Sequence, residues 1–454
     1  MKSILILLCL IMIPAQLFAN EFSFHQKSGI KPGPTLLIIG GIDGDEPGGF
    51  HAAATLVTRY HIEQGNLWIV PNLNFPAILS RVRGTMNLKF ARVAKNDPQY
   101  SSIKKIKSII TDPQVDLVLN LHDGSGFYHP TRISSQRNPN RWGQSCVIDQ
   151  EQLPGAKFGQ LRKMAETTIQ QVNTKALTKD HFFHIKNMMT ASTKDDIPAK
   201  KSLSFFAMRH HKPTIAVEAS KKHPIYLRTY YHLIALESFM QQMGIKFSRN
   251  FPLTLAGVEQ IIKDDALISF AEGRIRLELN NMRTTINHFP LPKAVEPEFT
   301  SPNPLVTIQP SEDRYRIHYG NNRLAFLDPE YFDLDRSIAG VEMLIDGVQQ
   351  QVNFGSIIAV RKQFLINNQK GYRINVIGFK QPGYASDGNF QIRYSQLKKS
   401  YSIDKAGQVY RVEVYRKERF SGMVLVNFRP ESTTKETRLA QATPTNQTTN
   451  ERHN

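Results

Sequence analysis

The 454-residue sequence is poor in cysteine, in long apolar runs and in negative charge. Its two cysteines, Cys9 and Cys146, allow at most one disulfide, which excludes a small disulfide-stabilised secreted scaffold. Beyond residue 19 no apolar run reaches the about 18 residues that a membrane-spanning helix needs, so we expect no membrane span. The 57 Lys and Arg residues against 39 Asp and Glu give a formal net charge of +18, which favours an acidic polymer or surface as partner.

The first 19 residues have the layout of a cleavable secretory signal. Lys2 precedes an apolar run over Ile4–Ile13, and Ala19 is a small residue at the expected cleavage point. Cleavage would remove Cys9 and leave Cys146 as the single cysteine. An exported protein of this size without a disulfide is typical of the bacterial periplasm. Export argues against nucleic acid as the acidic partner, and the basic residues are spread along the chain without aromatic repeats.

Short apolar runs alternate with amphipathic helical patterns between about residues 35 and 250. This alternation predicts an α/β domain in which helices flank a mixed, largely buried sheet. The chain is too long for one core, so further domains follow. The expected strands are Thr35–Ile39, Leu67–Val70, Val115–Leu121 and Thr214–Val217, and the expected helices are Pro47–Arg59, Ala156–Thr174 and Tyr226–Met243.

After residue 250 the pattern changes to short alternating strands with Gly, Asn and Asp turns, which is typical of small all-β domains. Five prolines between Pro290 and Pro304 exclude a central strand or helix there. We predict a signal peptide over 1–19, the α/β domain over 20–250, a small β-rich domain over 251–335, a β-sandwich-like domain over 336–430 and a disordered tail over 431–454. The expected elements are the helix Ala256–Lys263 and the strands Ile275–Leu279, Arg314–His318, Val341–Ile345, Gln350–Phe354, Ile357–Val360, Tyr372–Ile377, Phe390–Tyr394, Val409–Tyr415 and Met423–Phe428.

An acidic, glycine-rich loop, GGIDGDEPGG over residues 40–49, follows the first expected strand. It has neither the G-x-G-x-x-G register nor a G-K-[ST] ending, and its carboxylates would repel phosphate. Asp43 and Glu46 can instead converge on one metal ion at the carboxyl end of the strand, with Asp45 pointing away. The alternative is a solvated turn before a helix that begins with acidic residues.

Two further strand ends carry polar side chains suited to the same edge of the sheet. His122, in NLHDGSG, emerges where a buried strand meets small residues, and with Asp43 and Glu46 it would complete an accepted zinc-ligand set. Glu218, in TIAVEASK, ends another apolar strand, where a carboxylate is costly without a role or a partner. A structural histidine, and a Glu218 paired with Lys221, Lys222 or a nearby histidine, are the alternatives.

The segment Asn72–Arg92 is dense in basic and amide side chains. Arg83 with Asn87 could clamp a terminal carboxylate, because guanidinium meets carboxylate in a two-pronged pair. An exposed basic loop without a ligand is the alternative for this segment.

Together these motifs resemble the zinc carboxypeptidase family of the funnelin type over about residues 30 to 245. They are most similar to the periplasmic peptidoglycan D,L-carboxypeptidases that determine cell shape in helical and curved bacteria. The resemblance implies one Zn²⁺ held by Asp43, Glu46 and His122, Glu218 as general base, and release of meso-diaminopimelate from tripeptide stems. It also implies two β domains after the catalytic one. By the same resemblance Arg83 and Asn87 bind the substrate carboxylate, and Trp142 and Ser204 lie in the pocket.

The sequence departs from the family pattern at two positions. Asp43 stands where the usual first ligand is histidine, and aspartate is a competent but harder ligand. Leu88 follows Asn87 where an arginine is usual, and Lys89 or Arg92 would have to supply the missing cation.

Three functions therefore stay open at this stage. The first is the peptidoglycan carboxypeptidase, with stem peptides as substrate and other cell-wall proteins as candidate partners of the β domains. The second is a catalytically weakened or silent peptidoglycan-binding scaffold on the same fold. The third is a different hydrolase, such as a deacylase that acts on an amino-acid amide.

Overall fold

The computed structural model describes residues 22–193, 197–294 and 297–428, which form two compact units. The first comprises the described residues up to Leu334 together with Glu418–Phe420, and the second comprises Asp335–Lys417 and the described residues from Ser421 onward. The first unit holds both the α/β domain and the β-rich segment that we predict separately, so the division near residue 250 stays a prediction. The predicted signal peptide and the predicted tail lie outside the described residues.

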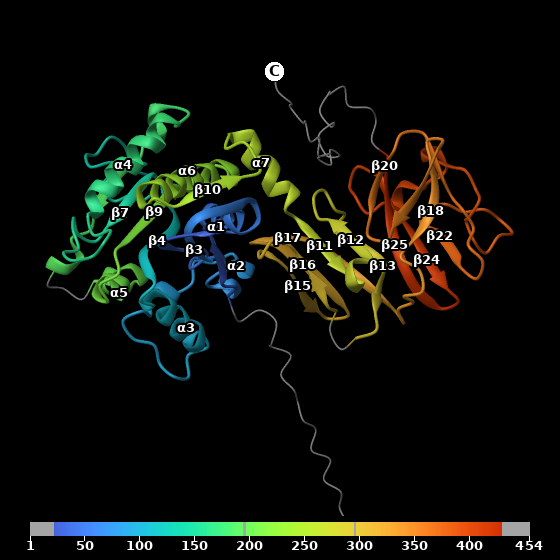
Figure 1. Cartoon of the computed structure of the whole chain (residues 1–454), viewed down its shortest axis with the longest axis horizontal. Helices are drawn as coiled ribbons and strands as arrows, with labels where there is room; N and C mark the ends of the chain where they lie inside the picture. Colours follow the sequence, from blue (N-terminus) through green and yellow to red (C-terminus); the bar gives the residue numbers. More distant parts are fainter. Residues whose placement is uncertain (1–21, 194–196, 295–296, 429–454) are drawn as a thin grey trace, which may run out of the picture. The chain divides into compact units, whose positions relative to one another are not determined.

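A mixed eight-stranded sheet forms the centre of the α/β part (Figure 1). Its order is β1-β3-β2-β4-β9-β7-β8, and β10 also pairs with β3. The inner strands β3, β2, β4 and β9 are parallel, whereas β1 and β10 are antiparallel to β3 and β7 is antiparallel to β9. These strands span β1 His25–Ser28, β2 Lys31–Ile39, β3 Tyr60–Val70, β4 Val115–Gly124, β7 Ser145–Ile148, β8 His184–Asn187, β9 Thr214–Ser220 and β10 Lys246–Arg249.

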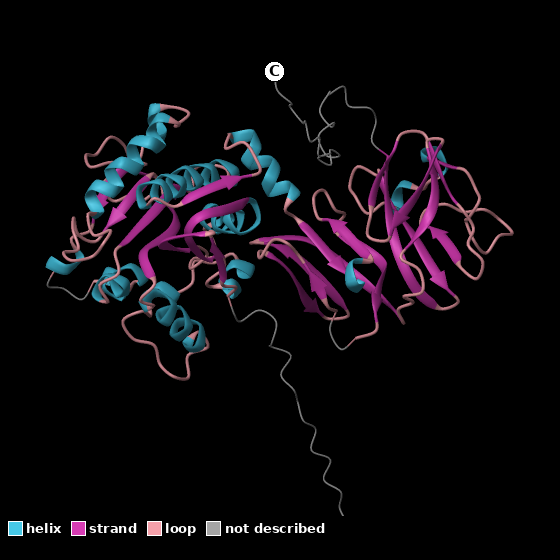
Figure 2. Cartoon of the chain, viewed as in Figure 1, coloured by secondary structure: helices cyan, strands magenta, loops and turns pink. Residues whose placement is uncertain are grey.

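Helices cover both faces of this sheet, as predicted (Figures 1 and 2). The predicted helix over Pro47–Arg59 has the observed bounds, and Gly244 ends the long helix α6 in a left-handed conformation. The helix predicted from Ala156 begins only at Leu161, because a turn with Gly155 at φ +79° occupies the preceding residues. The helices span α1 Pro47–Arg59, α2 Phe75–Ser80, α3 Tyr100–Thr111, α4 Leu161–Thr174, α5 Leu203–Arg209, α6 Ile225–Met243 and α7 Leu255–Asp264.

Alternate residues of the central strands enter two different cores. In β4, Leu117, Leu119 and Leu121 pack with side chains of α1, α4 and α6 in one core, whereas Val118 packs with α3 and α5 in the other. The period of two places the intervening residues on the α3/α5 face. On that face Asn120 and His122 continue the row of Val118 toward the carboxyl end of β4.

Strands dominate the chain after α7 (Figure 2). In the first unit β13 and β14 carry or flank the prolines of the Pro290–Pro304 segment, and each lies at the edge of its sheet, where a missing N–H is tolerated. The strands β11, β13, β14, β15 and β17 are absent from our predictions, because β11 and β14 are short and the other three carry prolines. The bounds are β11 Leu267–Phe270, β12 Ile275–Glu278, β13 Thr285–Pro292, β14 Phe299–Thr300, β15 Val306–Ser311, β16 Arg314–Tyr319 and β17 Asn322–Phe332.

The second unit is built from two four-stranded sheets, β19-β18-β21-β23 and β20-β25-β24-β22. The predicted fold class, an α/β domain followed by all-β structure, is confirmed. Within the described residues no helix is long and apolar enough to cross a membrane. The bounds are β18 Gly340–Ile345, β19 Val348–Asn353, β20 Ile357–Val360, β21 Gln363–Ile366, β22 Arg373–Val376, β23 Ile392–Arg393, β24 Val409–Arg416 and β25 Arg419–Phe428.

Truncation of the central core is expected to destabilise the first unit. Leu119→Ala removes a fully buried side chain from β4 and should lower the free energy of unfolding by about 2–5 kcal/mol. Chemical denaturation followed by tryptophan fluorescence measures this unit alone, because both tryptophans, Trp68 and Trp142, lie in it. Ile30→Ala, at a side chain that is 95% exposed, is the control and should change the value by less than about 0.5 kcal/mol.

Candidate active site

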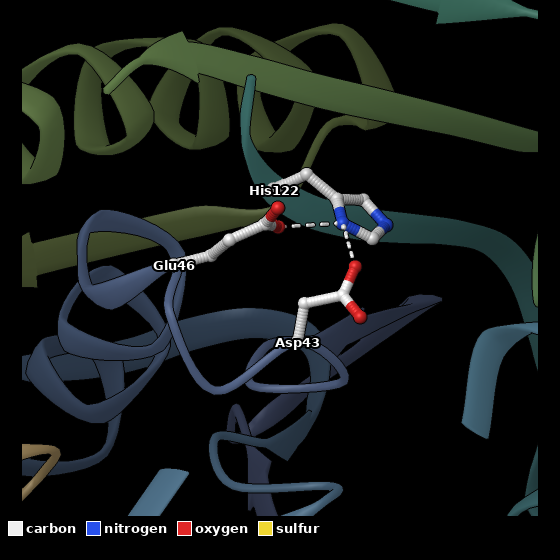
Figure 3. A group of neighbouring side chains, drawn as sticks. All are labelled: Asp43, Glu46 and His122. Carbon is white, nitrogen blue, oxygen red and sulfur yellow. Dashed lines mark hydrogen bonds and ion pairs between the residues drawn. The ribbon is translucent and has the colours of Figure 1, made fainter. Parts of the chain in front are cut away.

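Asp43, Glu46 and His122 form a buried group suited to a metal ion (Figure 3). One ligand atom from each residue lies within 4.8 Å of the others. His122 Nδ1 is 2.8 Å from Glu46 Oε2 and 3.5 Å from Asp43 Oδ2. Asp43 Oδ2 is buried without a hydrogen-bond partner, so this oxygen is available as a ligand. Two carboxylates and one imidazole that converge in this way fit a divalent cation.

The negative charge of the buried carboxylates around His122 favours a positive charge at this position. Burial alone would lower the pKa of His122, but the carboxylates of Glu46, Asp43 and Glu218 raise it well above its usual value. Protonation of His122 would therefore balance part of the negative charge of its neighbours. A bound cation would replace this proton, because a metal ligand must be deprotonated. Asp45 lies outside the trio, as predicted, and its Oδ2 accepts a 2.5 Å hydrogen bond from Lys221 Nζ.

Glycines shape the loop that carries the two carboxylates. Gly41 adopts a φ of +71°, which side chains other than glycine rarely tolerate. A Cβ on Gly44 would lie 2.0 Å from the carbonyl oxygen of Ala77, and the Gly44 N–H donates to the carbonyl of Val82 at 2.9 Å. The loop is thus packed directly against α2 and the turn that follows it.

Asp123 fixes His122 relative to the helices behind the sheet. It is fully buried and accepts hydrogen bonds from Gly48 N at 2.7 Å, Arg228 Nη1 at 2.7 Å and His232 Nε2 at 3.2 Å. Burial would raise its pKa, but the hydrogen bond from His232 and the charge of Arg228 hold the pKa below its usual range. One carboxylate therefore joins β4 to the first turn of α1 and to α6.

Glu218 lies beside the trio on the neighbouring strand. The register pairs Glu218 of β9 with His122 of β4. Burial raises the pKa of Glu218 to about 8, opposed by the charge on His122 and reinforced by the carboxylate of Glu46. The alternative partner Lys221 instead lies 3.3 Å from Glu46 Oε1, besides its bond to Asp45. In the described part of the chain no residue is hydrogen-bonded to the carboxylate of Glu218.

A cavity of about 440 Å³ opens onto this site. Seven of the eight residues singled out from the sequence line it, and the eighth, Asp43, belongs to the adjoining trio. Arg83 is largely exposed, with Nε 3.6 Å from Asp43 Oδ2, and Asn87 Oδ1 accepts a hydrogen bond from Leu203 N at 3.0 Å. The lining residues predicted from the sequence are Glu46, Arg83, Asn87, His122, Trp142, Ser204 and Glu218.

The structure brings in residues that sequence reasoning missed. Asp149 lines the cavity and follows a strand that was not predicted, and Lys221, expected only as an alternative partner of Glu218, also lines it. Lys89, a candidate for the missing cation, is engaged elsewhere, 2.8 Å from Asp97 Oδ2. Asn321 belongs to a turn more than 270 residues from the ligand loop, so no local pattern could have indicated it.

The turn between β16 and β17 supports the ligand loop from the β-rich part of the first unit. Asn321 Nδ2 donates to the carbonyl of Gly44 at 3.3 Å, and the carbonyl of Asn321 accepts from Arg81 Nε. Beside them the ring of Tyr319 meets His51 of α1 edge to face, with centroids 5.0 Å apart. The β-rich segment thus holds the carbonyl that lies between the two carboxylate ligands.

The mixed sheet, the buried trio and the adjoining acid define a metal-dependent peptidase of the carboxypeptidase class. A family model described as "Carboxypeptidase controlling helical cell shape catalytic" matches residues 1–263, and one described as "C-terminal domain of metallo-carboxypeptidase" matches residues 334–429. The chain belongs to this family of cell-shape-controlling carboxypeptidases and is a metallocarboxypeptidase, which confirms the resemblance stated from its motifs.

Solved structures of the cell shape determinant Csd4 from Helicobacter pylori are similar to nearly the whole chain. The apo form is 36% identical, with a TM-score of 0.78, over 90% of this chain and 100% of that one. The tripeptide-bound form has the same values. The form bound to mDAP, described as a D,L-carboxypeptidase, covers 89% of this chain.

A curated enzyme is similar to a shorter stretch of the chain. The N-alpha-acetyl-L-2,4-diaminobutyric acid deacetylase of Halomonas elongata is 38% identical over 103 residues, which is 20% of this chain and 29% of that enzyme.

Loss of the Asn321 side chain is expected to loosen the ligand loop. Asn321→Ala removes one hydrogen bond to the Gly44 carbonyl and should weaken divalent-metal affinity roughly 2- to 10-fold, as one hydrogen bond is worth. Competition with a chelating dye measures this affinity. Asn322→Ala is the matched control, because no described residue is hydrogen-bonded to the Asn322 side chain. Equal metal affinity in wild type and Asn321→Ala would contradict a positioning role.

Proposed function

We propose that this protein is a periplasmic, zinc-dependent D,L-carboxypeptidase that releases meso-diaminopimelate from the tripeptide stems of peptidoglycan and so affects cell shape. The observation that carries the proposal is the convergence of Asp43, Glu46 and His122 beside Glu218, at a cavity that also holds Arg83. Structures of the similar Csd4 protein with tripeptide and with mDAP support this substrate class.

Asp43, Glu46 and His122 would hold one Zn²⁺. Their donor set of two oxygens and one nitrogen leaves a fourth position open, as in catalytic zinc sites. When bound there, zinc polarises the scissile carbonyl and makes water more acidic. The buried Asp43 Oδ2, which has no hydrogen-bond partner, supports the assignment of aspartate as the first ligand.

Glu218 acts as general base and then as general acid. It takes a proton from the attacking water and delivers this proton to the departing amine. A carboxylate whose pKa lies near neutral pH is suited to both transfers, and the raised pKa of Glu218 agrees with this role. A nearby cation would lower that pKa, because positive charge favours the ionised form.

Arg83 and Asn87 hold the carboxylate of the departing residue, which makes the enzyme an exopeptidase. The Arg83 guanidinium is largely exposed and free to turn from Asp43 toward a substrate. Leu88 offers no charge, Lys89 is paired with Asp97, and Arg92 is exposed and does not line the cavity. The carboxylate site therefore depends on Arg83 more strongly than in the usual family pattern. Trp142 and Ser204 complete the lining around the peptide.

The charge of the chain agrees with the proposed location. The excess of positive charge favours retention near an anionic cell wall after export, and other cell-wall proteins are candidate partners of the β domains. A silent peptidoglycan-binding scaffold would keep the fold but bind no stoichiometric metal. A deacylase would cleave acylated amino acids in preference to peptides, so substrate profiling separates it.

The proposed activity is tested directly with purified tripeptide muropeptides. The zinc-loaded protein should release one diaminopimelate per stem, detected by mass spectrometry. Glu218→Gln should lower kcat by about 10²- to 10⁴-fold while zinc content by elemental analysis stays stoichiometric, since Glu218 is outside the ligand trio. If the zinc-loaded wild type leaves all of the tripeptide uncleaved, the proposed carboxypeptidase activity is contradicted.

Substitution of the unusual ligand tests the metal assignment. Asp43→His should bind zinc more tightly, on the order of tenfold, because imidazole nitrogen is a softer ligand than carboxylate oxygen. Chelator competition measures the affinity, and the tripeptide assay follows activity in parallel. Asp45→His removes the same charge outside the trio and should leave zinc affinity near that of wild type. Unchanged affinity in Asp43→His would remove Asp43 from the ligand set.

A further inference from the structure

A buried carboxylate in the cavity has no part in the chemistry described so far. Asp149 directly follows β7, is 9% exposed and lines the same cavity as His122 and Glu218. It belongs neither to the metal trio nor to the basic segment that contains Arg83. Its position and surroundings indicate what it contacts when substrate is bound.

The strand register places Asp149 at a distance from the reacting groups. Ser145 of β7 pairs with Glu218, and Val147 pairs with Ala216, so Asp149 continues the same face of the sheet. Four residues separate it from Ser145, which corresponds to roughly 13 Å along an extended strand. This span accommodates a scissile amide beside Glu218 followed by an extended aliphatic side chain that points toward Asp149.

Apolar side chains line the cavity on the Asp149 side, and Asp149 adds a carboxyl group there. Val147 and Met188 line the cavity on the Asp149 side, and the Met188 N–H donates to the carbonyl of Ile148 at 2.9 Å. Asp149 Oδ1 accepts a 2.5 Å hydrogen bond from the hydroxyl of Thr190. Within the described residues Asp149 Oδ2 accepts no hydrogen bond, and no lysine or arginine forms an ion pair with Asp149.

Among the described residues this buried carboxyl group has no counter-charge, which makes its ionised form costly, and burial raises the pKa of Asp149 above its usual value. A cationic ligand group would remove that cost. The Thr190 hydroxyl fixes one oxygen and so orients the other, as a binding site for an ammonium group requires.

We propose that Asp149 is a specificity-determining residue that binds the ammonium group at the distal end of a C-terminal diamino acid. This inference rests on the proposed carboxypeptidase function and names the group by which the enzyme distinguishes diaminopimelate from residues without a second amine. Arg83 then holds the carboxylate at the near end of the departing residue, and Asp149 holds the amine at the far end.

Two substrates and two variants test the subsite. One tripeptide ends in meso-diaminopimelate, and the other ends in 2-aminopimelate, which keeps the distal carboxylate but lacks the distal amine. Asp149→Asn removes the charge and keeps an oxygen that can accept from Thr190. Glu151→Gln makes the same charge change two residues away on an exposed side chain and serves as the control.

Wild type and Glu151→Gln should favour the diaminopimelate substrate in kcat/KM by roughly 10- to 100-fold, the worth of a buried charge-assisted hydrogen bond. Asp149→Asn should lose this preference because its kcat/KM falls for the diaminopimelate substrate and stays the same for the 2-aminopimelate substrate. If Asp149→Asn lowers kcat/KM equally for both substrates, Asp149 only positions Thr190. This result would overturn the inference and leave the proposed function standing.

Calorimetric binding of the free amino acids to the zinc-loaded protein gives a second readout. Wild type should bind diaminopimelate more tightly than 2-aminopimelate, and Asp149→Asn should bind both alike. If neither tripeptide is cleaved but this binding preference depends on Asp149, the proposed function fails and the subsite stands. Equal binding of the two amino acids by wild type overturns the subsite.

Discussion

The burial of several carboxylates around a single histidine is the constraint on which this site depends. Asp43, Glu46 and Glu218 are each no more than 8% exposed, and their charges raise the pKa of His122. Isolated buried charges are expensive, so such an arrangement persists only with compensating positive charge. The ammonium of Lys221 supplies part of it, and a divalent cation held by the proposed ligands would supply the rest.

Contacts with the surrounding structure hold His122 and the loop that carries Asp43 and Glu46 in place. Asp123 satisfies the first turn of α1 and two side chains of α6, and its neighbour His122 is thereby fixed on β4. The ligand loop is fixed from the opposite direction by α2 and by Asn321. Ligands that are held by elements distant in the sequence lose little freedom on binding a metal, which is the advantage of a preorganised site. The β-rich segment therefore supports the loop that carries two of the proposed metal ligands.

The four inner strands of the α/β part could be predicted because each contains a continuous apolar run, and α1 and α6 because their starts and stops are clear. The outer strands β1, β7, β8 and β10 and the helices α2, α3 and α5 were not predicted. The polar residues at strand ends were informative for the same reason: an Asp, a His or a Glu interrupts an apolar run where burial is certain. Strands such as β15 and β17 could not be predicted, because they carry prolines or mixed polar residues and gain their register only from partners. Lys221 and Asn321 act through contacts across more than 170 residues, which no local pattern encodes.

Asp149 illustrates a general limit of reasoning from strand ends. Its strand, β7, runs antiparallel to β9, so its end lies away from the edge where His122 and Glu218 gather. A search for carboxylates at the carboxyl ends of parallel strands therefore passes over it. The same antiparallel pairing places a negative group at the far end of a cavity whose near end holds the reacting groups. An antiparallel pair such as β7 and β9 can thus separate the proposed recognition of a side chain from the chemistry at the peptide bond.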